Sequence, residues 1–155
     1  MFKSLFALSL LFTSFVSFAD DKAELAAADS VLDSLHDAAA KADWDRYFNL
    51  YTEDGIFLGT DVTERWTMDQ FKGYASGSKG WVYTKRERHM AITADKNTIW
   101  FDEILDSAKY GTSQGSGLLV KTDAGWRIAQ YHLTFPIPND LAKEFTDKIK
   151  EFEGK

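Results

Sequence analysis

The sequence contains no cysteine, and only two prolines and three histidines occur among its 155 residues. Without cysteine the chain cannot form disulfides, so its fold must be stabilised by packing. His36, His89 and His132 are too far apart in sequence to form a His-x-x-x-His ligand pair, so we expect no metal. Nucleophile-elbow, phosphate-loop and dinucleotide motifs are also absent, and we expect no cofactor.

Basic residues are outnumbered by acidic residues, 18 to 24, which gives a formal net charge of −6. An acidic chain is poorly suited to bind the phosphate backbone of nucleic acids or an anionic membrane surface. We therefore expect neither of these as a partner.

The first 19 residues have the pattern of a secretory signal peptide. Lys3 precedes an apolar segment, and the small residues Ser17 and Ala19 are spaced as a cleavage site before Asp20 requires. The alternative is a membrane anchor, but the apolar run is shorter than the roughly 20 residues that span a bilayer. Cleavage would leave 17 basic and 24 acidic residues, a net charge of −7. We expect export to a bacterial periplasm, because small secreted animal domains usually carry disulfides.

Residues 20–155 contain no internal repeat or low-complexity linker, and we expect them to form a single domain. Hydrophobic residues make up 45% of the chain and charged residues 27%, as in soluble globular proteins. Aromatic residues make up 15%, which favours a core or a pocket built from large flat side chains.

Apolar residues at helical spacing predict helices near both ends of this domain. The first begins near Leu25 and ends near Ala39, and a shorter one covers "WDRYFNLY" (residues 44–51), with Asp43 as its N-cap. A final amphipathic helix is expected after Asn139. Each of these helices has one apolar face that must pack against another element.

A complete helix start signal precedes residues 68–75. Thr67 and Gln70 have the spacing of a capping box, and Trp66 and Phe71 have the spacing of a hydrophobic staple. We therefore predict a short helix over "MDQFKGYA".

Between Trp81 and Pro136 the apolar pattern changes to the alternation of β-strands. Two pairs of strands are expected, each joined by a short turn, and Pro136 ends the last strand because proline cannot donate to a ladder. The predicted strands cover residues 81–93, 98–106, 115–122 and 126–135. Helices followed by an antiparallel sheet indicate an α+β fold.

Three segments together resemble the SnoaL-like branch of the NTF2-like superfamily. They are the helix-to-strand passage ending in "LYTEDGIFLG", the strand "IWFDEIL", and the last strand "GWRIAQYHLTFP". The resemblance covers most of residues 25–138. It implies a conical, cystatin-like fold in which a strongly curved antiparallel sheet wraps around the N-terminal helices, with the C-terminal helix added. It also implies a cavity and pairing of two copies through the sheet, but no particular reaction.

Two polar residues, Gln130 and His132, lie within the apolar last strand. Side chains alternate along a strand, so they share a face with Trp126 and Ile128. The resemblance implies that this face points into the cavity, so we expect Gln130 and His132 to line it. His132 could then act as an acid or base near neutral pH. The alternative is that His132 hydrogen-bonds only the backbone.

Asp102 and Glu103 are adjacent in their strand and must point to opposite faces. The resemblance favours Asp102, beside Trp100, as the carboxylate in the cavity. A carboxylate in an apolar cone would have a raised pKa and could act as a general acid or base. The alternative is an internal ion pair with Arg86 or Arg88 of the preceding strand. Arg88 could also contact an anionic group of a ligand.

Aromatic residues are expected to complete the pocket wall. Trp44, Tyr47, Trp100 and Trp126 are the candidates, whereas His36 lies among acidic residues and is expected on the surface. The first functional hypothesis is an exported domain that binds a small, partly apolar organic molecule. The second is a cofactor-independent isomerase, cyclase or hydrolase that uses His132 and Asp102. The third is an interaction module. We expect a homodimer in each case.

Overall fold

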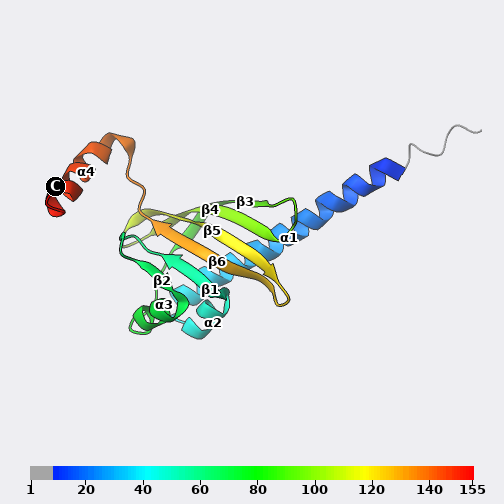
Figure 1. Cartoon of the computed structure of the whole chain (residues 1–155), viewed down its shortest axis with the longest axis horizontal. Helices are drawn as coiled ribbons and strands as arrows, with labels where there is room; N and C mark the ends of the chain where they lie inside the picture. Colours follow the sequence, from blue (N-terminus) through cyan, green and yellow to red (C-terminus); the bar gives the residue numbers. More distant parts are fainter. Residues whose placement is uncertain (1–8) are drawn as a thin grey trace, which may run out of the picture.

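The computed structural model describes residues 9–155, with side chains from residue 20 onward, as four helices and six strands (Figure 1). In chain order these are α1 (Ser9–Ala40), α2 (Trp44–Asn49), β1 (Tyr51–Leu58), β2 (Arg65–Thr67), α3 (Met68–Ala75), β3 (Thr84–Ile92), β4 (Thr98–Ser107), β5 (Gly111–Thr122), β6 (Gly125–Thr134) and α4 (Asn139–Phe152). The predicted α+β fold is confirmed.

The six strands form one open sheet in the order β2-β1-β6-β5-β4-β3. Four of the five pairings are antiparallel, as predicted, but β1 and β6 are parallel, so the sheet is mixed. The connection between β1 and β6 contains β2, α3 and β3 to β5, which is long enough for the chain to return in the same direction. In Figure 1 the sheet lies over α1, with α2 and α3 near the β1 and β2 end.

The core lies between the sheet and the helices, and we call this side of the sheet the inner face. Leu32 and Leu35 of α1 are fully buried there, together with Ile99, Leu119 and Ile128 of the strands. Complete burial of an aliphatic side chain of this size stabilises the fold by about 2 kcal/mol. The packing of α1 therefore fixes which strand residues point inward.

The predicted start of α3 is confirmed in detail. The Thr67 hydroxyl accepts a hydrogen bond from the Gln70 backbone N–H, and the Gln70 side chain accepts one from the Thr67 N–H at 3.0 Å. Trp66 packs on Phe71 with 5.4 Å between ring centroids. These contacts bring both aromatic rings to the same end of the sheet.

Three register shifts interrupt the regular pairing of the sheet: one between Tyr51 and Ile56 of β1, opposite β6, and two bulges in β6 and β3. In β6, Ala129 is the extra residue, because Leu118 of β5 pairs with Gln130 while Leu119 pairs with Ile128. In β3, Arg86 is the extra residue in the pairing with β4. A bulge adds one residue to one strand, so side chains after it point to the opposite face from that expected by strict alternation.

Two strands include segments that are not typical of strands. β1 contains "TEDG" (residues 52–55), and β5 begins at Gly111, four residues before its predicted start. Both segments have weak β-propensity, but the neighbouring strands supply hydrogen-bond partners that override it.

The N-terminal prediction falls partly outside the described residues. Residues 1–8 are not described, and α1 begins at Ser9, within the segment expected to be a signal peptide. Among the residues described, no helix is both long and apolar enough to cross a membrane.

α4 follows the two prolines and extends away from the sheet (Figure 1). Leu141, Phe145 and Ile149 lie on it, each 42–48% exposed, and Phe152 is 93% exposed. The helix forms as the sequence predicts, but no residue of its apolar face is buried against the described chain.

Candidate functional site

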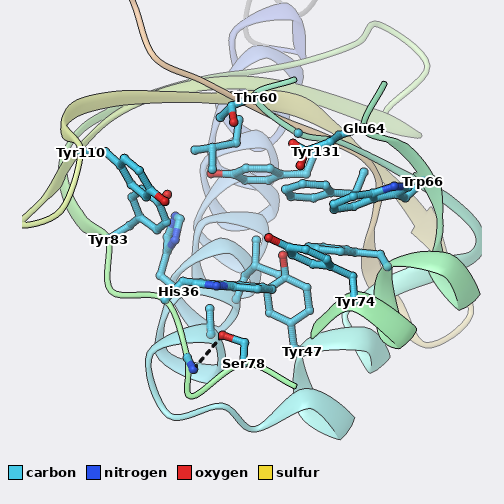
Figure 2. Close-up of a pocket in the computed structure, with 18 of the residues that line it drawn as sticks. His36, Tyr47, Thr60, Glu64, Trp66, Tyr74, Ser78, Tyr83, Tyr110 and Tyr131 are labelled. Carbon is cyan, nitrogen blue, oxygen red and sulfur yellow. Dashed lines mark hydrogen bonds between the residues drawn. The ribbon is translucent and has the colours of Figure 1, made fainter. Parts of the chain in front are cut away.

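A cavity of about 360 Å³ lies between the inner face of the sheet and the helices (Figure 2). Aromatic residues make up half of its lining: Tyr47, Phe57, Trp66, Phe71, Tyr74, Trp81, Tyr83, Tyr110, Tyr131 and Phe135. Several of these rings are nearly parallel. Phe71 and Trp81 are inclined by 1° and Phe57 and Tyr131 by 2°. The resemblance predicted such an aromatic cavity, although most of its residues are not those we expected.

A buried carboxylate, Glu103, lies behind this cavity. Its side chain is fully buried on the inner face of β4, between its cross-strand neighbours Arg88 and Gly115. Tyr131 reaches across Gly115 and donates its hydroxyl hydrogen to Glu103 Oε1 at 2.7 Å. A Cβ atom on residue 115 would lie only 2.8 Å from Glu103 Oε1 and from Tyr131 Cζ. Gly115 therefore provides the space in which Tyr131 meets Glu103.

His36 connects Glu103 to the cavity. It lies on α1, its side chain is 13% exposed, and its Nε2 is 2.8 Å from the same Glu103 Oε1 that Tyr131 contacts. Because an ionised carboxylate only accepts hydrogen bonds, Nε2 carries the hydrogen. In the described part of the chain, Nδ1 has no hydrogen-bond partner, and the ring lines the cavity (Figure 2). With its hydrogen on Nε2, the ring leaves the lone pair of Nδ1 free to accept a hydrogen bond.

Arg88 compensates the buried charge of Glu103. Its side chain is 3% exposed, and Nε and Nη2 lie 2.8 and 2.7 Å from Glu103 Oε2. Nη1 donates to Asp29 and Asp33 on α1, at 2.5 and 2.9 Å. Asp29, Asp33 and His36 are spaced by four and three residues, so they share one helix face. This network fixes α1, and with it His36, against β3 and β4.

The contacts determine the protonation states of the cluster. Burial alone would raise the pKa of Glu103, but the hydrogen bond from His36, the charge of Arg88 and the hydrogen bond from Tyr131 outweigh it and hold the pKa below its ordinary value. Burial and the Glu103 charge raise the pKa of Tyr131 well above its ordinary value. Glu103 is therefore ionised and Tyr131 protonated at neutral pH.

All six tyrosines of the chain lie in or next to the cavity. Tyr47, Tyr74, Tyr83, Tyr110 and Tyr131 line it, and Tyr51 is 3.2 Å from Tyr47, oxygen to oxygen. In Figure 2 the hydroxyls of Tyr83 and Tyr110 lie on the same side of the cavity as His36. Burial raises the pKa of Tyr83, so its hydroxyl remains a hydrogen-bond donor. His36, Tyr83 and Tyr110 thus bring three polar groups together at one side of the cavity.

Gln130 and His132 do not face this cavity, and the orientation predicted for them is wrong. Trp126 and Ile128 point inward as predicted, but the bulge at Ala129 reverses the pattern, so Tyr131 and Leu133 line the cavity. Gln130 and His132 consequently lie on the opposite side of the sheet, which we call the outer face.

Asp102 and Trp100 also lie on the outer face, contrary to the prediction. Asp102 pairs there with His89, whose Nδ1 is 3.1 Å from Asp102 Oδ2, and Trp100 is 47% exposed. β4 has no bulge between them, so its inner positions are Ile99, Phe101 and Glu103. Glu103 can be buried because Arg88 compensates its charge, as the alternative of an internal ion pair anticipated.

The remaining predicted contacts are divided between the cavity and the core. Tyr47 lines the cavity. Trp44 packs behind it, 5.8 Å from the Tyr47 ring and 4.7 Å from that of Trp81. Trp126 is buried away from the cavity and donates its indole hydrogen to Glu24 at 2.7 Å. Arg88 points inward as predicted, but carboxylates of the chain occupy its donors.

Among the cavity residues that sequence reasoning missed, His36 and Tyr131 are the two that contact Glu103. His36 was expected on the surface, whereas it is buried against Glu103, so that expectation is wrong. The sequence contained one sign that His36 is not on the surface. Asp29, Asp33 and His36 share a helix face, so the two carboxylates would need a basic partner and the histidine an acidic one. Within the described residues, no group of three or more potential ligands could hold a metal ion.

A family model described as a SnoaL-like domain matches residues 28–138. The chain belongs to the SnoaL-like family. No curated protein matches the sequence. Among solved structures, it is similar to a protein assigned as a scytalone dehydratase from Novosphingobium aromaticivorans, at 13% identity over 77% of this chain and 89% of that one, with a TM-score of 0.64.

Two further structures have the same fold. One is a ketosteroid isomerase-like protein from Erwinia carotovora atroseptica, with 18% identity, coverage of 74% of this chain and 98% of that one, and a TM-score of 0.57. The other is a cystatin-like domain of unknown function from Nostoc punctiforme, with 12% identity, coverage of 86% and 98%, and a TM-score of 0.59. At these identities the similarity shows that this SnoaL-like chain has an NTF2-like fold, and nothing about its reaction.

Proposed function

We propose that this SnoaL-like domain binds a small, flat, partly apolar organic molecule in the inner-face cavity. The observation that carries the proposal is the set of nearly parallel aromatic rings around a space of about 360 Å³. Aromatic rings favour offset stacking with other flat rings. The hydroxyls of the tyrosines and Nδ1 of His36 would orient polar groups of the ligand, as in other pockets of this kind.

The test is a titration with naphthol, followed through quenching of tryptophan fluorescence. Trp66 and Trp81 line the cavity and would report its occupation. The matched control ligand is decahydronaphthol, which has the same skeleton but puckered rings. We expect naphthol to bind about tenfold more tightly, because only flat rings can stack on both walls. Equal affinity, or tighter binding of the puckered and more apolar alcohol, would contradict a flat binding slot.

A second candidate function is acid–base catalysis on such a molecule, favoured by the contact of His36 with Glu103. Glu103 holds the Nε2 hydrogen, which leaves Nδ1 facing the cavity as a general base. A nearby phenol such as Tyr83 could donate a hydrogen bond to the oxygen on which negative charge develops. Structural relatives assigned as a dehydratase and an isomerase-like protein are consistent with this class of chemistry.

Proton exchange tests the catalytic candidate without knowledge of the substrate. Tetralone, a ketone with a fused aromatic ring, has exchangeable C–H groups beside its carbonyl, and their replacement by deuterium in heavy water can be followed by NMR. We expect the protein to accelerate this exchange and His36→Gln to abolish the acceleration. Binding of tetralone without acceleration would leave the domain as a binding protein only.

A further inference from the structure

A second cavity, of about 570 Å³, borders α4 and the loop between β1 and β2. Four residues line both this cavity and the aromatic one: Gly59, Thr60, Glu64 and Phe135. Figure 2 shows Thr60 and Glu64 at the edge of the aromatic cavity. These shared residues lie at the border between the two cavities and contribute surface to both, so the two cavities are neighbours. We call the second cavity the α4 groove.

The α4 groove is lined by both apolar and polar side chains. Leu58, Val62, Ile137 and Phe145 form its apolar part, and the polar residues that line it are Thr60, Asp61, Glu64, Arg65, His132 and Thr134. Val62 is 94% exposed, and Ile137 and Phe145 are 40% and 42% exposed, so nothing in the described chain covers these side chains. Contiguous exposed apolar surface of this kind marks a binding site more often than single exposed residues do.

We propose that the ligand is elongated, with a flat ring part in the aromatic cavity and an alkyl chain in the α4 groove. The chain would cross the rim between Thr60 and Phe135 and lie against Phe145. This inference rests on the proposed function, because the chain is located by the ring part to which it is attached. The two cavities are adjacent, since they share four lining residues, and this adjacency favours an attached alkyl chain over a second copy of the protein.

The groove also limits the length of the chain. Phe145 lies six residues after Asn139, the first residue of α4, which corresponds to about 9 Å along the helix. Ile149 and Phe152 follow on the same apolar face but do not line the groove. The benefit of a longer chain should therefore end once the chain has passed Phe145.

The test uses alkoxynaphthols with the hydroxyl on one ring and the alkoxy chain on the other, from methoxy to octyloxy. Phe145→Ser removes a groove wall, and Phe152→Ser is the matched control on the same helix face outside the groove. For wild type and Phe152→Ser we expect affinity to rise about twofold per added methylene and then level off. This increment is less than the roughly fourfold of complete burial, because the groove is open. Phe145→Ser should bind naphthol normally and lose the chain-length dependence.

The outcomes separate this inference from the proposed function. If naphthol binds but affinity is independent of chain length in wild type, the elongated ligand is excluded and the cavity proposal stands. If no compound binds, the proposed function fails and the inference fails with it. Sedimentation of each variant tests the remaining alternative, in which a second copy of the protein occupies the groove. Loss of a dimer in both Phe145→Ser and Phe152→Ser, without chain-length dependence in wild type, would assign the groove to a second copy and overturn the proposal.

Discussion

The two faces of the sheet carry similar residue types with different structural roles. On the inner face, Glu103 is fully buried and contacts His36 at 2.8 Å. On the outer face, Asp102 contacts His89 at 3.1 Å, but its side chain is 38% exposed and that of His89 is 59% exposed. A histidine–carboxylate pair is therefore not itself a site. The inner pair differs because Arg88, Tyr131 and the packed helix surround it and help to hold the pKa of Glu103 below its ordinary value.

The largest expected effect comes from removing the charge that compensates Glu103. Arg88→Met leaves a buried carboxylate without its main positive partner, and we expect a loss of about 3 kcal/mol in the free energy of unfolding. Arg86→Met is the matched control, because Arg86 lies in the same strand and pairs with Asp106 in an exposed ion pair. We expect it to cost less than about 0.5 kcal/mol. Equal losses of unfolding free energy for the two variants, measured by urea unfolding, would show that the buried ion pair of Arg88 is no more important for stability than the exposed pair of Arg86.

Gly115→Ala should have the next largest effect. The new Cβ would overlap Glu103 Oε1 and the Tyr131 ring, and we expect a loss of about 2 kcal/mol. Gly73→Ala is the control, because a Cβ there has no neighbour within 4 Å and alanine favours the helix, so stability should rise slightly. In a Tyr131→Phe background, Gly115→Ala should cost less. An unchanged cost would mean that Tyr131 does not determine the need for glycine.

The fold was more predictable from sequence than the orientation of the site residues. The Thr67–Gln70 capping box and the helix that follows it depend on neighbouring residues, so the local pattern was sufficient. The inward or outward direction of Gln130 and His132 depends on one extra residue, Ala129, whose effect is set by pairing with β5. A rule of strict alternation along the strand therefore cannot predict on which face these two side chains lie.

A sign of the bulge was nevertheless present in the last strand. Trp126 and Ile128 form one apolar alternation, and Tyr131 and Leu133 form another that is out of phase with it. Such a shift predicts a bulge between the two sets. The burial of Glu103 was harder to foresee, because its compensating partners come from α1 and β3, far away in sequence.

Acid titration should show a smaller effect of the inner face, as a gradual loss of the stability that Glu103 contributes. The pKa of Glu103 is lowered on folding from about 4.5, so its stabilising contribution is present above that value and lost as pH falls through the lower pKa of the folded state. The urea midpoint of wild type should therefore fall more steeply below about pH 4.5 than that of Glu103→Gln. Parallel curves for the two proteins would contradict the low pKa of Glu103.

On the outer face, the stabilising contribution of His89 should change with pH in the opposite direction. The Asp102 hydrogen bond and nearby acidic charges raise the pKa of His89, so its contribution is present at low pH and lost as pH rises through this raised value. NMR titration of His89 should show this raised pKa, and Asp102→Asn should return it toward its ordinary value. Because the pair is exposed, the global stability of Asp102→Asn should hardly change.

The smallest effect on folding is expected at Trp100, which pairs with the exposed Leu118 on the outer face. We propose this face as the surface through which two copies associate. Trp100→Thr should then weaken association in sedimentation experiments and change the unfolding free energy of the monomer by less than about 0.5 kcal/mol. A wild-type protein that stays monomeric at high concentration would remove this proposal.

The central claim is that the ring part of the ligand binds in the inner-face cavity beside His36, and that His132 on the outer face does not contact this part. Titration of naphthol into His36→Gln and His132→Gln tests it directly. We predict about tenfold weaker binding for His36→Gln, the effect of one lost hydrogen bond in a buried site, and unchanged binding for His132→Gln. Weaker binding to His132→Gln, with His36→Gln unaffected, would contradict the account.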